Sequence, residues 1–211
     1  MELVVLKKNI YKCYNLSMAN IATGLNEQIL ETAKDLFINK GYHGLSMREI
    51  SDALNVSKAA LYYYFKDKEE LFLEILKIYL EDMSIALEKI QAESTSSKQQ
   101  IQHFIRHVLT QPAKQRATIR LASQEIIHLT PKVRKTFDTL YREKFIGKVQ
   151  AILQKGIDSG EFRKMQIEVA VWALLGIMFP YFYPTHSGDS PLPDKTIQEV
   201  TDIYLNGIIK K

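Results

Sequence analysis

Hydrophobic positions recur at helical spacing along most of this chain. Apolar side chains three and four residues apart are typical of amphipathic helices, and no stretch alternates with a period of two for long enough to indicate a sheet. The pattern therefore predicts an all-α protein. The longer helices are expected at residues 26–40, 67–92, 98–110, 113–129, 131–159 and 169–183, followed by a last helix that opens at Thr196.

Polar residues mark where several of these helices begin and end. Asn26 and Ser57 are side chains that can cap a helix. Gly41, Asn55 and Gly160 follow predicted helices and tolerate the left-handed backbone that ends them. Capping boxes, in which two side chains satisfy each other's amides, are predicted at Ser46-x-x-Glu49, Asp67-x-x-Glu70 and Thr196-x-x-Glu199.

The segment 46–71 reads as three short, separately capped helices, and the first two are joined tightly enough to form a helix-turn-helix. Met47, Ile50, Ala53 and Leu54 are expected on the buried face of its first helix. At about 100° per residue, the second helix turns one side toward that face and the other outward. The predicted inner residues are Ser57, Ala60, Leu61 and Tyr64, and the outer ones are Lys58, Ala59, Tyr62 and Tyr63.

This outer face has the chemistry that a DNA major groove accepts. Lys58 can donate to a guanine edge or a phosphate, Ala59 can touch a thymine methyl, and phenols can donate to phosphate oxygens. The alternative is that Tyr62, Tyr63 and Tyr64 are core and interface aromatics. Three consecutive aromatics cannot all be buried on one helix, so at least one must face outward.

The run VSKAALYYYFKDKEEL resembles the signature of TetR-family transcriptional regulators, and the similarity extends over about residues 26–75. The chain departs from the family pattern at Asn55, where Gly is usual, and at Tyr64, where His is commoner. The resemblance implies a DNA-binding domain at residues 25–71, with the helix-turn-helix at about 46–65, and a helical ligand-binding and dimerisation domain at 72–211. The DNA-binding residues that it implies, together with the outer face, are Ser46, Arg48, Ser57, Lys58, Ala59, Ala60, Tyr62, Tyr63, Tyr64 and Lys68.

The charge distribution does not support DNA binding by itself, so that prediction rests on the sequence motif. The net charge is +4, but acidic residues outnumber basic ones in residues 1–97, and the excess of Lys and Arg lies in residues 98–211. Attraction to phosphate must therefore be local. The single cysteine excludes an intrachain disulfide, and the apolar start is too short for a signal peptide, so we expect a cytoplasmic protein.

Residues 1–24 are expected to lie outside the fold. They contain Lys7, Lys8 and Lys12, and a basic arm of this kind can reach the minor groove. The alternatives are a disordered tail, or an upstream start with Met18 as the true initiator.

The second half is expected to supply a dimer interface and a pocket. Residues 169–183 are apolar on all sides but short of the ~20 residues that cross a membrane, which predicts a buried helix rather than a span. The resemblance implies that this helix and the last one pair with their copies in a second subunit. The pocket candidates, for which ordinary core packing is the alternative, are Phe104, Val108, Tyr141, Phe145, Trp172, Leu175, Phe179 and Tyr183.

No motif indicates an enzyme or a cofactor, because phosphate loops, nucleophile elbows and HExxH are all missing. His103 and His107 share a helical face at a spacing that can hold a metal, with pocket or solvent-facing histidines as the alternative; no metal site is predicted. The resemblance to TetR-family regulators implies instead a homodimeric repressor, not an enzyme, that binds double-stranded operator DNA and is released by an unidentified small molecule. An activator, or a ligand- or metal-binding protein without DNA function, is the alternative.

Overall fold

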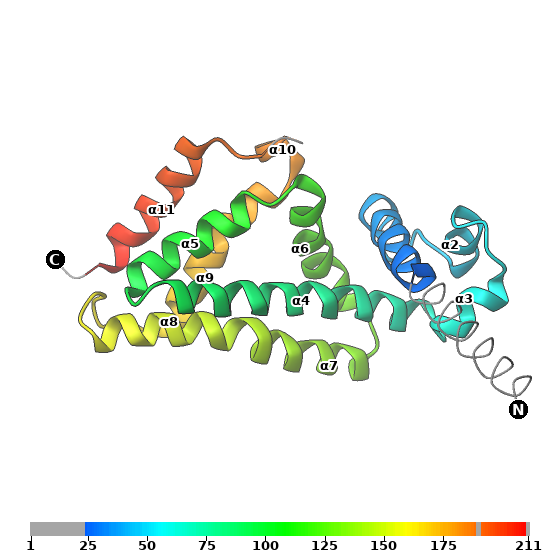
Figure 1. Cartoon of the computed structure of the whole chain (residues 1–211), viewed down its shortest axis with the longest axis horizontal. Coiled ribbons are helices and arrows are strands. Elements are labelled where there is room, and N and C mark those ends of the chain that lie inside the picture. Colours follow the sequence, from blue (N-terminus) through cyan, green and yellow to red (C-terminus); the bar gives the residue numbers. More distant parts are fainter. Residues whose placement is uncertain (1–23, 189–190, 210–211) are drawn as a thin grey trace, which may run out of the picture. The chain divides into compact units, whose positions relative to one another are not determined.

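The computed structural model describes residues 24–188 and 191–209. In this part of the chain, all secondary-structure elements longer than a single β-bridge are helices (Figure 1). The one β contact among these residues is an isolated bridge between Phe162 and Ile209. The predicted all-α fold class is thus confirmed. The chain divides into two compact units between Glu74 and Ile75.

The first unit contains a helix over residues 24–40, α2 (Met47–Ala53), α3 (Lys58–Tyr64) and the start of α4 (Lys68–Glu93). Gly41 ends the first of these helices with a φ of 71°, as predicted, and its amide donates to the Phe37 carbonyl at 2.8 Å. An aromatic cluster forms the core, in which the Phe72 ring lies 5.0 Å from Phe37 and 5.3 Å from Tyr42 between centroids.

The second unit holds the rest of α4 and the helices that follow it. These are α5 (Ser97–Leu109), α6 (Ala113–Glu125), η1 (Ile126–His128), α7 (Pro131–Tyr141), η2 (Arg142–Ile146), α8 (Gly147–Asp158), α9 (Ile167–Met178), η3 (Phe179–Phe182), α10 (Pro184–Ser187) and α11 (Asp194–Ile208).

Helix packing in this unit is tied together by polar contacts as well as by apolar ones. Helix α5 packs on α8 and α11, and α9 packs on α8 and α11. Lys144 lies 2.9 Å from Glu81 of α4, and Lys148 pairs with Glu88 of the same helix. The Glu161 carboxylate accepts from the first amides of α5, at 3.0 Å from Ser97 N and 3.1 Å from Lys98 N. It thereby satisfies donors that have no partner within the helix.

Several predicted helix starts are wrong. Residue 24 is already helical, so Asn26 lies inside the first helix rather than at its cap. Helix α11 begins at Asp194 after Pro193, which places Thr196 within the helix. Asp67 Oδ1 does accept from Glu70 N at 2.7 Å, but Glu70 reaches back to Lys66 N instead of completing a box.

Two predicted segments also differ from the structure in the second unit. The single helix expected at 131–159 contains a π-helical turn, η2, and ends at Asp158; Gly160 follows it with a φ of 78°, as predicted. The short helix α10 lies between the last two predicted helices, where the sequence pattern predicts no helix.

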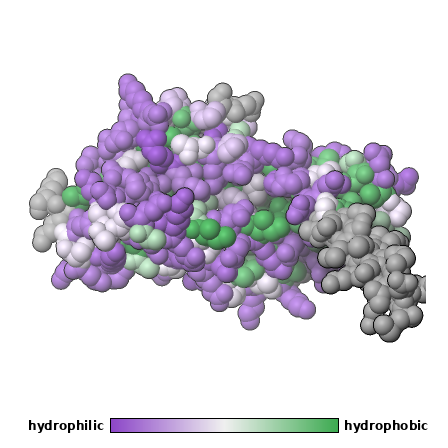
Figure 2. Space-filling model, in the orientation of Figure 1, coloured by the Kyte–Doolittle hydropathy of each residue, from purple (hydrophilic) through white to green (hydrophobic). Residues whose placement is uncertain are grey.

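The segment 169–183 is not buried on all sides within the single chain. Ala170, Val171, Leu174 and Met178 are buried, whereas Val169 and Trp172 are 61% and 59% exposed. On the face that Figure 2 shows, hydrophilic side chains predominate and hydrophobic residues form separate patches between them. In the first unit the same kind of correction applies to α2, where Ala53 is exposed and Ser51 is buried.

Candidate nucleic-acid interface and cavity

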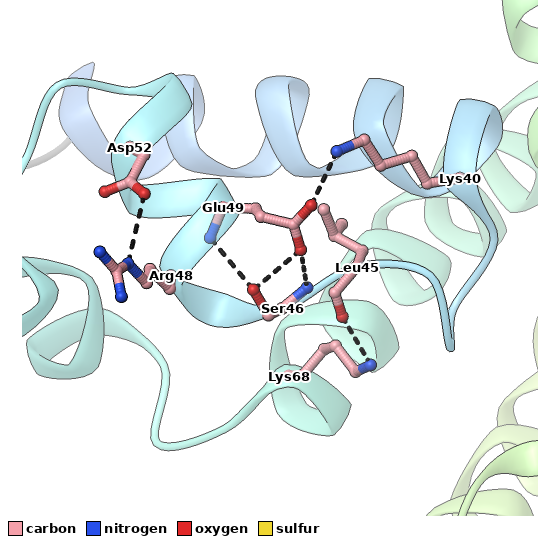
Figure 3. A network of polar contacts seen from close by, with 7 residues as sticks. All are labelled: Lys40, Leu45, Ser46, Arg48, Glu49, Asp52 and Lys68. Carbon is pink, nitrogen blue, oxygen red and sulfur yellow. Dashed lines mark hydrogen bonds and ion pairs between the residues drawn. The ribbon is translucent and has the colours of Figure 1, made fainter.

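The start of α2 is fixed by the predicted capping box (Figure 3). Ser46 Oγ accepts from Glu49 N at 3.2 Å, and Glu49 Oε2 accepts from Ser46 N at 2.9 Å. Lys40 Nζ donates to the other carboxylate oxygen at 2.8 Å. The bonds from Lys40 and Ser46 lower the pKa of Glu49 to about 2, so the box carries its negative charge at neutral pH.

The turn into α3 depends on a left-handed residue and a second cap. Asn55 has a φ of 54°, which Asn tolerates better than most residues. Val56 N then donates to the Ser51 carbonyl at 3.0 Å. Ser57 Oγ accepts from Ala60 N at 3.1 Å, as predicted, and begins α3.

Helix α3 presents the face that helical spacing predicts. Leu61 is fully buried, and Ala60 and Tyr64 are half-buried. Lys58 and Ala59 are exposed, and Tyr62 and Tyr63 are 49% and 83% exposed. The face therefore offers one ammonium and two phenols, with no acidic side chain between them.

The other predicted DNA-binding residues lie in different settings. Arg48 is exposed, and its Nε lies 3.7 Å from Asp52 Oδ2 on the next turn of α2 (Figure 3). Lys68 does not project freely: its Nζ donates to the carbonyls of Tyr42 at 2.6 Å and Leu45 at 2.7 Å. It also lies 4.3 Å from the centre of the Tyr42 ring. These contacts hold the loop before α2 against the start of α4.

The second unit encloses a cavity of about 440 Å³. This is within the usual range for small-molecule sites. Seven of the eight predicted pocket residues line it: Phe104, Val108, Tyr141, Phe145, Trp172, Leu175 and Phe179. Tyr183 lies outside the lining; its hydroxyl accepts from Gln124 Nε2 at 3.2 Å, and Arg120 lies 5.4 Å from its ring centre.

Sequence reasoning missed the contribution of α4 to the cavity. Leu76, Tyr79, Leu80 and Met83 of this helix line the wall. Their spacing of three and four residues could have indicated a shared face, but α4 is apolar over much of its circumference. Only the packing shows which of its faces borders empty space.

The two histidines considered as metal ligands do not form a cluster. His103 is exposed, whereas His107 is half-buried, with its Nε2 at 3.3 Å from Gln111 Nε2. Burial lowers the pKa of His107. Within residues 24–188 and 191–209, no three His, Cys, Asp or Glu side chains come together as a metal site. No helix in these ranges is both long and apolar enough to cross a membrane.

Comparison with known proteins decides the family. The sequence model described as "Bacterial regulatory proteins, tetR family" matches residues 29–75, and "Tetracyclin repressor-like, C-terminal domain" matches residues 94–180. The uncharacterized HTH-type transcriptional regulator YfiR of Bacillus subtilis (strain 168) is 32% identical over 143 residues, or 66% of this chain and 68% of YfiR. This chain belongs to the TetR family.

Further relatives agree with a TetR regulator over nearly the full length. The HTH-type transcriptional repressor KstR2 of Rhodococcus jostii (strain RHA1) is 24% identical over 191 residues, covering 88% of this chain and 92% of KstR2. The crystal structure of the TetR-family regulator PfmR from Thermus thermophilus superposes with a TM-score of 0.72 at 30% identity, covering 84% of this chain and 97% of PfmR.

TetR membership indicates the general role of the protein and relates its two units to the two family models. The chain is a transcriptional regulator with a helix-turn-helix of the DNA-binding type, and small-molecule binding is typical of its family. The α2–α3 pair lies within the stretch that matches the N-terminal family model. Most of the cavity wall outside α4 lies within the stretch that matches the C-terminal one.

Proposed function

We propose that this TetR regulator is a homodimeric repressor that binds operator DNA through α3 and leaves it when a small molecule fills the cavity. The observation that carries the proposal is the outer face of α3. Lys58, Tyr62 and Tyr63 are exposed there, while Leu61 anchors the opposite side in the core. A capped helix that packs one face in the core and exposes a cation on the other suits a major groove.

The remaining DNA contacts in this proposal come from the start of α2 and the neighbouring cap. Arg48 is exposed and can reach a phosphate, and Ser46 and Ser57 place helix N-termini near the backbone. Ala59 supplies an apolar contact beside Lys58. Ala60 and Tyr64 are half-buried, so we assign them to support of the helix.

Repression and dimerisation rest on separate observations. The relative KstR2 is described as a repressor, which favours the same sign of regulation here. Val169 of α9 and Ile203 of α11 are 61% and 67% exposed, and both line a shallow groove between these two helices. Exposed apolar side chains in one patch favour burial against a second copy of the chain.

Helix α4 supports the proposed coupling between ligand and DNA. It is continuous from Lys68, which binds carbonyls of the first unit, to Tyr79 and Met83, which line the cavity. A ligand shifts the regulator between states only if it binds them unequally. If the cavity wall along α4 differs between the DNA-bound and the released state, the ligand would bind one of these states more tightly.

The test is binding of the purified protein to DNA upstream of its own coding region, measured at several salt concentrations. We expect a footprint with two half-sites about 34–36 Å apart, or a multiple of that spacing. Lys58→Ala should weaken binding on the order of tenfold and reduce the salt dependence by roughly one phosphate contact. Tyr62→Ala should also weaken it.

The matched control is Lys195→Ala on α11, which removes one exposed ammonium from the other unit. It should leave DNA affinity unchanged, as should the helix content and oligomeric state of all three variants. Unchanged affinity in both Lys58→Ala and Tyr62→Ala would refute α3 as the reading helix.

A further inference from the structure

The cavity wall contains no cationic side chain. Among its lining residues, the polar ones are Tyr79, Ser123, Asp138 and Tyr141, and the rest are apolar or Gly. Arg120 belongs to α6, which contributes to the wall, but it is not part of the lining and donates to the Phe182 carbonyl at 3.3 Å. A carboxylate or phosphate group placed among these apolar side chains would therefore lose hydration without gaining a counter-charge, which disfavours its binding.

The wall is also poorly suited to a cation. Its single charged residue, Asp138, is exposed. Solvent screens an exposed carboxylate, so its attraction for a bound ammonium is small. The charges of the lining thus favour a ligand that carries no charge.

Two of the four polar residues of the lining are phenols. Tyr79 projects from α4 and Tyr141 from α7, where its ring lies 5.7 Å from Phe137 and 5.5 Å from Phe145. Within residues 24–188 and 191–209, neither hydroxyl has a hydrogen-bond partner. Each hydroxyl is therefore available to donate to a ligand that enters the cavity.

Both phenols keep their protons at neutral pH. Burial raises the pKa of Tyr141 to about 12. Burial also raises the pKa of Tyr79, and the nearby Tyr141 and Asp82 raise it further. Tyr79 and Tyr141 line the same cavity. Each hydroxyl can donate one hydrogen bond, and a ligand oxygen has two lone pairs that can accept.

We propose that the cavity binds an uncharged, mainly hydrocarbon molecule whose single oxygen function, an alcohol or a ketone, accepts hydrogen bonds from Tyr79 and Tyr141. The volume of about 440 Å³ accommodates a medium-length chain or a compact ring system. The proposal rests on the proposed function only in taking this cavity as the effector site.

The direct test compares three probes of equal chain length and different charge: decanol, decanoate and decylammonium. Trp172 is the only tryptophan of the chain and lines the cavity, so its fluorescence reports binding without DNA. We expect saturable binding of decanol at least about tenfold tighter than that of either charged probe. Equal or tighter binding of decanoate or decylammonium, or no saturable binding of decanol, overturns the proposal.

The phenols are tested by Tyr79→Phe and Tyr141→Phe. Each should weaken decanol binding about fivefold, the usual effect of losing one hydrogen bond. Neither should lower the melting temperature of the ligand-free protein, because no internal bond is lost. The matched control is Tyr181→Phe, a tyrosine of η3 outside the lining. Undiminished decanol affinity in both cavity variants would refute the assigned role of the phenols.

Operator binding in the presence of decanol separates this inference from the proposed function. If decanol changes Trp172 fluorescence but leaves the protein on DNA, the ligand class stands and the proposed release mechanism fails. If the protein binds its operator but Trp172 responds to a charged probe in preference to decanol, the regulator stands and the ligand class fails.

Discussion

Lys58 and Lys68 show how far two cations with the same predicted role can differ. Lys58 is exposed on α3, whereas Lys68 donates to two carbonyls and lies over an aromatic ring. An ammonium has three donors and no acceptor. With two of them bound to the Tyr42 and Leu45 carbonyls, Lys68 positions the loop before α2.

Lys68→Met tests this difference at the level of one residue. The substitution keeps an apolar chain of similar length but leaves both carbonyls without their donor. We expect the free energy of unfolding to fall by about 1–3 kcal/mol, measured by denaturant titration. Lys66→Met, an exposed neighbour, should change it by less than about 0.5 kcal/mol. Equal stability of the two variants would contradict a positioning role for Lys68.

At the scale of the element, α2 depends on a charged cap. The bonds from Lys40 and Ser46 lower the pKa of Glu49 from 4.5 to about 2. A carboxylate whose pKa is lower in the folded state stabilises the fold above its unfolded pKa, and this stabilisation is lost as the pH falls through the folded value. The capping box should therefore weaken between pH 4.5 and about 2.

Glu49→Gln should remove this part of the pH dependence. We expect its melting temperature to lie below that of the parent protein at neutral pH, and the gap to narrow as the pH falls from 4.5 toward 2. Circular dichroism melts across this range measure the gap. Glu27→Gln, which changes an exposed carboxylate of the preceding helix, is the control and should track the parent. A gap that stays constant with pH would argue against an ionised cap.

At the scale of the whole molecule, the exposed apolar faces of α9 and α11 matter most. Val169 and Ile203, which line the groove between these helices, are each more than half exposed. A monomer would leave these side chains in water, whereas a symmetric dimer would bury both of them in each of its two chains. The proposed homodimer therefore depends on this face, because only a second copy of the chain would bury it.

Ile203→Glu tests the face directly. A carboxylate placed in an apolar interface must be desolvated without a partner, so we expect sedimentation to shift from dimer toward monomer. Ile127→Glu is the matched control, because Ile127 of η1 is 63% exposed, close to the 67% of Ile203, but lies outside the α9–α11 groove. It should leave the dimer intact. A parent protein that sediments as a monomer, or a dimer that Ile203→Glu leaves unchanged, would contradict this interface.

The sequence by itself determined the features that depend on neighbours a few residues apart. The Ser46–Glu49 box, the Ser57 cap, the left-handed Gly41 and Asn55, and the outward face of α3 all follow from local geometry. The large apolar and phenolic residues on the predicted helices of the second half likewise included seven that border the cavity.

Tertiary structure decided what depends on distant partners. Lys68 binds carbonyls more than twenty residues away, and α4 lines the cavity with the face that packing leaves uncovered. The burial of segment 169–183 was also decided by tertiary structure. Apolar composition indicates that a helix can be buried, but not which of its sides another helix covers. Local patterns specify helices and their faces, whereas long-range packing specifies what each face meets.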